Sequence, residues 1–427
     1  MSSRATILSL LLSGFLAIPS GRNPLHAQPG RPTPEPVTDT TDPTVVLVSL
    51  DGFRWDYVER YSPPHLSDFI REGVRAVSME PCYPSKTFPN HYTIATGMYP
   101  DHHGLVDNSF RDLAKNAVYS IGKREMVEDG SWYGGTPLWV LAEQAGHRTA
   151  SFFFVGSEAD IQGIRPTHYR RYDAGISNQD RVRQALDWLS LPGKERPRLI
   201  TMYFSDMDDT GHRYGPDDDI RLAATLEKLD ETLGMLFDGI KALPVPVNVV
   251  IVSDHGMQSV PVAGLIPVEK LQAREDERYE LVNNGALVHL YLSDKADVGR
   301  VSARLKETAA HYQIYATREV PYFDVSPDNP RWGDIIVVPD SGHYFAGARV
   351  MAMRKASGQA VVGEHGFDTR RLDMHGIFYA KGPDIRQGLV LPTFKNIHVY
   401  PFVCRLLGLQ VPANVDGDPA VLAPALR

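Results

Sequence analysis

Aspartate and histidine side chains recur in this sequence at the ends of apolar runs, each time close to a glycine. The runs span residues 44–50, 199–204 and 247–252, and a further His-Gly pair lies later in the chain. The six side chains are Asp51, Asp208, His212, Asp254, His255 and His365. Their nitrogen and oxygen atoms are ligands that zinc accepts, and six of them suffice for two zinc ions that keep open coordination positions.

The spacing within two of these groups bears on metal binding. Asp208 and His212 are four residues apart, so on a helical turn both side chains can meet one ion. Asp254 and His255 are adjacent, and on a strand they would face opposite sides, but the Gly turn that follows lets them serve two neighbouring ions. Taken singly, each group is also typical of an ordinary acidic turn. Their recurrence at successive strand ends favours one shared site.

A threonine is the candidate nucleophile. Thr87 follows Lys86 in the stretch 84–92, and a run with helix potential begins at Tyr92. A loop at or near a helix N-terminus favours an anion, although a Thr there is also a common N-cap. Two metal ions suit in-line displacement at phosphorus, and metal coordination can deprotonate a threonine hydroxyl. The pattern therefore predicts chemistry at a phosphoryl group.

The apolar runs that precede the metal-type residues predict buried strands of one sheet. Runs 44–50 and 247–252 are β-branched and nearly all apolar, which is typical of central parallel strands. Helical patterns separate the runs, so we expect an α/β fold with a doubly wound, mostly parallel central sheet flanked by helices. Such a sheet gathers the carboxyl ends of its strands, and with them the six side chains, at one edge.

Other segments complete this fold. Residues 258 to about 360 are less regular and predict a smaller α+β subdomain inserted over the carboxyl edge of the sheet. The further predicted strands are 74–79, 149–155, 287–292, 313–317, 334–339 and 374–380. The further predicted helices are 65–71, 136–146, 179–189, 217–236, 297–312 and 396–407.

The composition is that of a globular protein with a large core. Of the 427 residues, 43% are hydrophobic and 22% charged, and the net charge is −8. No basic stripe is present, which argues against a role in coating nucleic acid. Cys82 and Cys404 are the only cysteines; a disulfide and two buried thiols are both compatible with their positions, and any metal must be held by His and carboxylates.

The N-terminal residues predict export. Residues 1–27 combine Arg4 with a short apolar run and a small-residue cleavage site after Ala27, which is typical of a signal peptide. An uncleaved membrane anchor is the alternative. Residues 28–43 are rich in Pro and Thr and predict a linker. We therefore expect a catalytic domain at 44–427 in a periplasmic or secreted monomer, without a membrane span in the mature chain.

Several segments together resemble a known family. Residues 86–92, 208–216, 253–257 and 365–368 are similar to the motifs of the nucleotide pyrophosphatase/phosphodiesterases, which belong to the alkaline phosphatase superfamily. The resemblance extends over roughly residues 44 to 410. It implies a bacterial-type, single-domain member of that family.

The resemblance implies a role for each candidate residue. One zinc ion would be surrounded by Asp51, Thr87, Asp254 and His255, and the other would be held by Asp208, His212 and His365. Thr87 would attack the α-phosphorus to form a covalent nucleotidyl-threonine, which water then hydrolyses. The Asn108 side chain and the backbone N–H of Thr87 would bind a non-bridging oxygen.

The resemblance also implies a slot for the nucleobase. Phe88 and Tyr203 would sandwich the base, and Tyr172 would line the slot. The histidines outside the ligand set would be His91, His102, His103, His343 and His375. Where the family often has Trp-Pro-Gly, this chain has Phe154-Val155-Gly156, and Asp206 stands where a Glu is frequent. The first departure bears on substrate fit.

These features predict a two-zinc phosphodiesterase that hydrolyses nucleoside triphosphates and dinucleoside polyphosphates to nucleoside 5′-monophosphates. The stretches 171–175 and 187–192 fit nucleotide-cleaving members, in which a loop blocks a lipid pocket. Alternatives within the same chemistry are lysophospholipid or choline-type diesters and phosphomonoesters. A sulfatase is excluded because Thr87 cannot become formylglycine. A metal-stabilised binding protein is the alternative outside enzymes.

Overall fold

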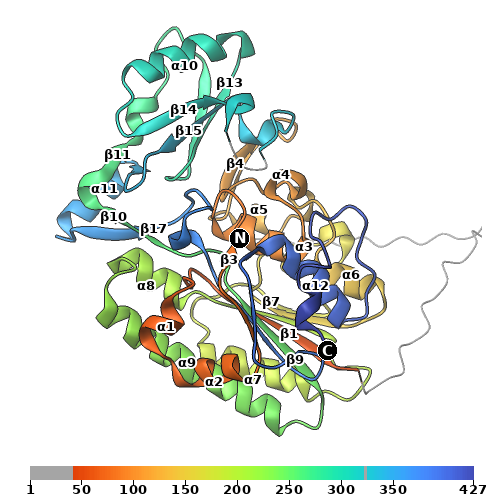
Figure 1. Cartoon of the computed structure of the whole chain (residues 1–427). Coiled ribbons are helices and arrows are strands. Elements are labelled where there is room, and N and C mark those ends of the chain that lie inside the picture. The colour runs from red at the N-terminus through yellow and green to blue at the C-terminus, as the bar shows by residue number, and fades with distance from the viewer. Residues whose placement is uncertain (1–41, 322–324) are drawn as a thin grey trace, which may run out of the picture. The chain divides into compact units, whose positions relative to one another are not determined.

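The computed structural model describes residues 42–321 and 325–427 (Figure 1). The predicted signal peptide at 1–27 lies outside the described residues, as does the predicted linker at 28–43 apart from its last two residues. Within the described part of the chain, no helix combines the length and apolar character that crossing a membrane requires.

An eight-stranded sheet forms the centre of the fold, in the order β19-β2-β18-β9-β1-β8-β6-β7. Strand β1 (Thr44–Leu50) lies between β9 (Val247–Val252) and β8 (Leu199–Phe204) and is parallel to both. All residues of β1 and β9 are buried, as expected for central strands covered on both faces. Only β18 runs antiparallel to its neighbours, so the predicted mostly parallel α/β sheet is confirmed.

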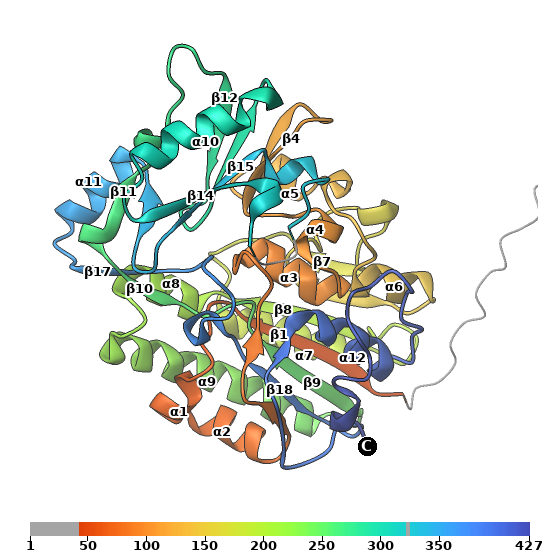
Figure 2. The same ribbon diagram turned by 45° about the horizontal axis from the view of Figure 1, so that its top comes forward.

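The side chains of β1 alternate between two hydrophobic cores. Val45 and Leu47 belong to one core and Val46 and Val48 to the other, as the two-residue period of a strand requires. Helices α3, α6 and α12 cover the first face, and α2, α7 and α9 cover the second. Figure 2 shows the sheet between α9 with α2 on one side and α3 with α12 on the other.

Residues that follow β9 build three further, smaller sheets. Strands β12 (Tyr279–Asn283), β13 (Val288–Leu292), β15 (Ile335–Pro339) and β14 (Tyr312–Ala316) form an antiparallel sheet. Helix α10 (Val298–Glu307) packs on it through Val301 and Leu305. Strand β10 pairs with β17, and β11 pairs with β16. We refer to residues 258–360 as the insert.

The remaining elements have the following bounds. The helices are α1 (Tyr57–Tyr61), α2 (Pro64–Arg71), α3 (Thr87–Thr96), α4 (Pro100–His103), α5 (Arg124–Val127), α6 (Leu138–Gln144), α7 (Asn178–Leu189), α8 (Asp206–Tyr214), α9 (Asp219–Ala242), α11 (Ala348–Ala356) and α12 (Val399–Leu406). The strands are β2 (Val74–Ala76), β3 (Met79–Glu80), β4 (Ser109–Asp112), β5 (Ala117–Ser120), β6 (Thr149–Phe152), β7 (His168–Arg170), β10 (Gln258–Pro261), β11 (Leu265–Pro267), β16 (Tyr344–Ala346), β17 (Val361–Glu364), β18 (Phe378–Lys381), β19 (Leu389–Leu391) and β20 (Phe394–Lys395).

Several predicted boundaries are wrong in an instructive way. Thr87 was expected in a loop before a helical run at Tyr92, but it is the first residue of α3. The early start is possible because Pro89 falls in the first turn, where backbone N–H groups have no partner within the helix and a missing N–H costs nothing. The strand expected at 74–79 is split into β2 and β3, and the strand expected from Met374 begins at Phe378.

The two cysteines are buried thiols. Cys82 and Cys404, which both lie in the described part of the chain, are not joined by a disulfide. The Cys82 Sγ lies 3.1 Å from Oδ1 of Asn396. Of the two alternatives left open by the sequence, the structure therefore has the thiols.

A buried histidine in α4 should make the stability of the fold pH-dependent. His103 is fully buried, its Nδ1 accepts the N–H of Leu105 at 3.2 Å, and its Nε2 lies 3.0 Å from Oγ1 of Thr93. Burial lowers the pKa of His103 to about 3, against about 6.5 in an unfolded chain. The unfolded state therefore binds the extra proton first, and stability is lost as the pH falls from about 6.5 toward 3.

We expect His103→Asn to flatten this dependence, because the Asn carbonyl still accepts the Leu105 N–H but does not titrate. In urea unfolding at pH 7.5, 6.0 and 5.0, the wild type should lose up to about 1.4 kcal/mol per pH unit more than the variant below pH 6.5. The exposed His311 provides the control, since His311→Asn should leave the wild-type slope unchanged. Equal slopes for wild type and His103→Asn would contradict the assignment.

Candidate metal centre and active site

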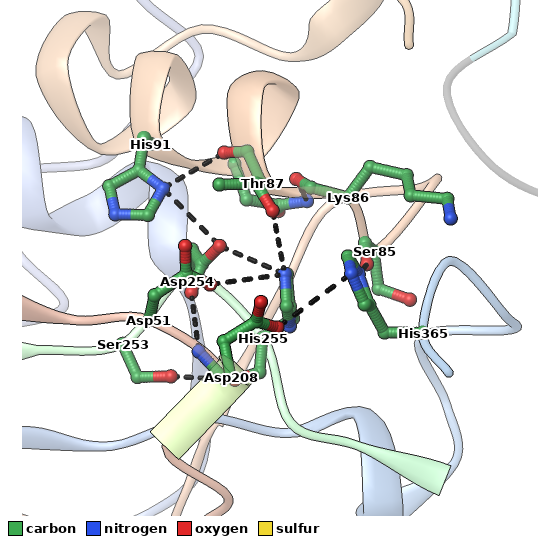
Figure 3. Close-up of polar contacts among 12 residues, drawn as sticks. Asp51, Ser85, Lys86, Thr87, His91, Asp208, Ser253, Asp254, His255 and His365 are labelled. Carbon is green, nitrogen blue, oxygen red and sulfur yellow. Dashed lines mark hydrogen bonds and ion pairs between the residues drawn. The ribbon is translucent and has the colours of Figure 1, made fainter. Parts of the chain in front are cut away.

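The metal-type side chains follow three neighbouring strands. Asp51 directly follows β1, Asp254 lies two residues beyond β9, and Asp208 lies in the first turn of α8, just beyond β8. Because β9, β1 and β8 are adjacent and parallel, their carboxyl ends meet at one edge. His365 arrives at the same place directly after β17. Figure 3 shows these side chains converging below the start of α3.

Close approach at this edge depends on one glycine. Gly52 has a φ of 62°, and a Cβ there would lie 2.8 Å from Cα of Asp208. Its N–H donates to Oδ1 of Asp254 at 3.2 Å. A side chain at residue 52 would therefore push α8 away from the end of β1 and strain the backbone at the same time.

One group of ligand atoms comes from Asp51, Asp254 and His255, all within 4.8 Å of one another. The Nε2 atom of His255 lies 3.0 Å from Oδ2 of Asp254 and 3.6 Å from Oδ1 of Asp51. The hydroxyl of Thr87 lies 3.3 Å from the same Nε2. The predicted nucleophile therefore stands at the edge of this group.

A second group comes from Asp208, His255 and His365, again within 4.8 Å of one another. His365 Nε2 lies 3.9 Å and His212 Nε2 3.4 Å from Oδ1 of Asp208. The rings of His255 and His365 stack with centroids 3.6 Å apart. His255 thus lies within reach of both groups, and His212 joins the second through Asp208.

Burial and mutual repulsion shape the ionisation of the carboxylates. Burial, together with the charges of Asp254 and Asp208, raises the pKa of Asp51 well above its usual value. Burial also raises the pKa of Asp208. Burial acts in the same direction on Asp254, but the neighbouring His255 and His91 outweigh it and hold the pKa of Asp254 well below its usual value.

Three carboxylate oxygens at this edge have no hydrogen-bond donor. Oδ1 of Asp51, Oδ1 of Asp208 and Oδ2 of Asp254 are buried and accept no hydrogen bond. Buried carboxylate oxygens are normally paired or bound to a metal. The donor set of oxygen and imidazole nitrogen is the set that divalent zinc takes in proteins, so the residues present fit a metal centre.

Outer hydrogen bonds orient the imidazoles. His212 Nδ1 donates to the carbonyl of Gly363 and His365 Nδ1 to the carbonyl of Ser85, each at 2.8 Å. Since a carbonyl only accepts, both rings carry their proton on Nδ1 and present Nε2 to the carboxylates. A backbone partner of this kind fixes the tautomer and ring plane of a metal-binding histidine.

His91 is a contributor that the sequence did not reveal. It was expected to lie outside the ligand set, yet it is fully buried with Nδ1 2.9 Å from the Thr87 carbonyl and 3.2 Å from Oδ2 of Asp254. Its Nε2 lies 2.8 Å from Oγ of Ser49. His91 therefore ties the first turn of α3 to Asp254. The available signal was its position four residues after Thr87, on the same helical face.

The other histidines outside the ligand set have partners elsewhere. His375 lies 2.9 Å from both Oγ of Ser78 and the carbonyl of Thr369, which occupies both ring nitrogens. His343 is hydrogen-bonded to the carbonyl of Ser341, and His102 is hydrogen-bonded to Asp416. None of these contacts involves the candidate metal ligands.

The start of α3 faces the site with backbone N–H groups. Oδ1 of Asn108 accepts the N–H of Phe88 at 3.0 Å, which puts the Asn108 amide beside the helix terminus. Lys86, in contrast, extends away from Thr87 in Figure 3, and its Nζ donates to the Tyr344 hydroxyl at 3.1 Å. Burial lowers the pKa of Lys86. The Asn108 amide thus lies beside the first turn of α3, and the Lys86 side chain extends away from Thr87.

A cavity of about 310 Å³ opens onto Thr87, Asp51 and Asp208. Its walls include all three aromatic residues predicted for the base slot, Phe88, Tyr172 and Tyr203. Tyr203 also donates its hydroxyl to Oδ2 of Asp51 at 2.5 Å. Val155 and Gly156, from the stretch expected to bear on substrate fit, also line the cavity. The remaining lining residues, which the sequence did not suggest, are Ile121, Arg124, Val127, Phe153 and Glu158.

The departure from Trp-Pro-Gly has a visible consequence in this cavity. Val155 and Gly156 line it, whereas Phe154 is buried and packs edge-on against Trp139. Arg124 and Glu158 form an ion pair at the cavity wall. Part of the cavity wall is therefore built from a small aliphatic residue and a charged pair.

Comparisons with known proteins find one family over most of the chain. The family model for type I phosphodiesterase/nucleotide pyrophosphatase matches residues 45–368. Human ectonucleotide pyrophosphatase/phosphodiesterase family member 1 is 33% identical over 409 residues, which are 90% of this chain and 42% of the relative. Human family member 5 is 30% identical over 86% of this chain and 74% of its own length. The chain thus spans less than half of the length of some relatives.

Solved structures match over a similar range. Murine ectonucleotide pyrophosphatase/phosphodiesterase 5 superposes with a TM-score of 0.81 and 27% identity, covering 90% of this chain and all of the other. An inactive variant of that murine protein in complex with AMP matches equally well. The motifs, the sheet and the matched range lead to one conclusion: the chain belongs to the type I phosphodiesterase/nucleotide pyrophosphatase family, in the alkaline phosphatase superfamily.

Proposed function

We propose that this protein hydrolyses nucleotides, such as nucleoside triphosphates and dinucleoside polyphosphates, to nucleoside 5′-monophosphates. The observation that carries the proposal is the position of Thr87. Its hydroxyl lies 3.3 Å from His255, at the junction of the carboxylate–imidazole groups and the aromatic-walled cavity. Nucleophile, ligand atoms and base slot therefore face the same space. The murine relative solved with AMP supports a nucleoside monophosphate as one product.

We further propose the domain organisation, the cellular location and the oligomeric state. Residues 44–427 would be the catalytic domain, with the insert at about 258–360. Export to the periplasm or medium and a monomeric state complete the proposal.

Two zinc ions are proposed as the cofactor. Asp51, Thr87, Asp254 and His255 would hold one, and Asp208, His212 and His365 the other. When bound, such ions supply the positive charge that lowers the pKa of a coordinated hydroxyl and offsets charge on phosphoryl oxygens.

Residues of the chain bind the substrate, attack the phosphorus and stabilise the developing charge. Phe88, Tyr203 and Tyr172 hold the nucleobase, which brings the phosphorus next to the nucleoside opposite the Thr87 hydroxyl. Attack by Oγ1 of Thr87 forms the Thr–O–P bond and breaks the bond to the leaving group, and water then hydrolyses the nucleotidyl-threonine. The amide of Asn108 and the backbone N–H of Thr87 at the start of α3 stabilise a non-bridging oxygen.

A substrate comparison tests the reaction class. With zinc present, kcat/KM for p-nitrophenyl thymidine 5′-monophosphate should exceed that for p-nitrophenyl phosphate by about 10²-fold or more, because only the diester fills the base slot and orients its phosphorus. Lysophosphatidylcholine and p-nitrophenyl phosphorylcholine complete the panel. Faster cleavage of the monoester or of the choline compounds would reject the nucleotide assignment.

Replacement of Thr87 tests the nucleophile. Thr87→Val keeps the shape of the side chain and should lower kcat by about 10⁴-fold or more, as loss of a covalent nucleophile does. Thr87→Ser, which keeps a hydroxyl, should retain a measurable part of the activity. Metal content by mass spectrometry should stay near that of the wild type in both. Activity of Thr87→Val close to wild type would remove Thr87 from this role.

Removal of metal should affect activity and stability together. Without a cation, Asp51, Asp208 and Asp254 crowd together at one sheet edge, and each keeps a buried oxygen that accepts no hydrogen bond. Dialysis against a chelator should abolish turnover and lower Tm, since a ligand at 1,000 times its Kd contributes about 4 kcal/mol. Zinc should restore both, and magnesium, which prefers all-oxygen sites, should not. Full activity in metal-free protein would contradict the proposed cofactor.

A further inference from the structure

Asn108 is held from both sides by residues of the insert. The residue before it, Asp107, contacts His289 of β13, and the residue after it, Ser109, contacts Asn284. These partners are separated from Asn108 by more than 170 positions in the sequence. The insert therefore contacts both neighbours of Asn108 in the sequence, through one buried and one half-buried set of polar contacts.

The first contact is a buried ion pair. His289 and Asp107 are both fully buried, with Nε2 of His289 3.1 Å from Oδ2 of Asp107. Nδ1 of His289 lies 3.0 Å from the carbonyl of Trp332. Since a carbonyl only accepts, Nδ1 of His289 donates to Trp332, and this bond sets the ring plane in which Nε2 faces Asp107. The other oxygen of Asp107 accepts the backbone N–H of Asn108 at 2.7 Å.

The second contact is a clamp on the following residue. Asn284 accepts the N–H of Ser109 through Oδ1 at 3.0 Å and donates through Nδ2 to the carbonyl of Ser109 at 2.8 Å. Two antiparallel hydrogen bonds between one amide side chain and one backbone unit fix both position and orientation. With Asp107 held on one side and Ser109 on the other, the backbone of Asn108 has little freedom.

The orientation of the Asn108 side chain is set by its hydrogen bond to Phe88. Because Oδ1 of Asn108 already accepts the N–H of Phe88, its amide NH₂ group is the part that can donate to a phosphoryl oxygen. We propose that His289, acting through Asp107, and Asn284 are positioning residues that hold this amide for the transition state. The inference rests on the function proposed above, in which Asn108 binds the non-bridging oxygen.

The energetic reason is the cost of leaving a buried polar group without its partner. Without His289, Oδ2 of the buried Asp107 loses its imidazole partner, and the side chain must rotate toward another donor or shift to reach water. Either change weakens the bond to the Asn108 N–H, and donors must be held closely to stabilise developing charge. The charge of Lys86 also interacts with Asp107, but the hydrogen bond of its Nζ is to the Tyr344 hydroxyl.

Two substitutions at one position separate positioning from packing. His289→Gln extends an amide toward the place of Nε2 and can still donate to Asp107, whereas His289→Asn reaches only the place of Nδ1 and can donate only to the Trp332 carbonyl. We expect His289→Asn to lower kcat on p-nitrophenyl thymidine 5′-monophosphate about 10-fold with KM within about twofold, and His289→Gln to recover most of that loss. A merely structural role predicts equal kinetics for the two.

A double-mutant cycle supplies the decisive readout. In an Asn108→Ala background the effect of His289→Asn should vanish, because a residue that acts through Asn108 has nothing left to position. Glu277→Gln breaks another buried ion pair of the insert, with Arg304, and should leave kcat unchanged. If His289→Asn lowers Tm more than Glu277→Gln does, the double-mutant cycle is repeated with Asn284→Ala in place of His289→Asn, since Asn284 contacts the residue on the other side of Asn108.

The outcomes are distinct. A large effect of Asn108→Ala with additive effects of His289→Asn and Asn284→Ala overturns the positioning role while leaving the proposed function intact. No effect of Asn108→Ala overturns both the phosphate-binding role of Asn108 and the inference that rests on it. Non-additive losses, with recovery in His289→Gln, support the inference.

Discussion

The charge of three buried carboxylates is the constraint on which the rest of this structure depends. Asp51, Asp208 and Asp254 converge at one sheet edge, and each keeps an oxygen without a hydrogen-bond donor. Isolated buried charges cost several kcal/mol each even after relaxation, and the histidines beside Asp254 and Asp208 offset part of this cost. These oxygens lower the stability of the fold, but they also suit the site to a metal ion, because a carboxylate oxygen without a hydrogen-bond donor is available as a ligand.

The remainder of the molecule supplies the rigidity that such a site requires. Helix α3 begins at Thr87, the proposed nucleophile, and His91 joins its first turn to Asp254. The Nδ1 atoms of His212 and His365 are tied to backbone carbonyls. Side chains that would otherwise repel or rotate are therefore held by partners that cannot themselves move far. Preorganisation of this kind lowers the reorganisation needed during reaction.

Much of the fold and part of the site could be predicted from the sequence, for physical reasons. The uniformly apolar run before Asp51 and the four-residue spacing of Asp208 and His212 are local signals, and the sheet edge and helix α8 follow from them. The helix start at Thr87 was missed because Pro89 disfavours a helix at most positions, and the sequence does not show that it falls in the first turn. The pairing of His289 with Asp107 was also missed, since it joins positions 182 residues apart, and no local periodicity reports such a contact.

The parallel placement of β1 beside β8 and β9 has one more consequence. Neighbouring strands lie about 4.8 Å apart because the backbone hydrogen bond has a fixed length. The carboxylates that leave β1 and β9 inherit their separation from this repeat of the peptide unit, and not from the side chains that fill the two cores. The strand spacing thus sets the distance between the ligand atoms. Apolar residues of the sheet can be exchanged for others of similar volume without changing that distance.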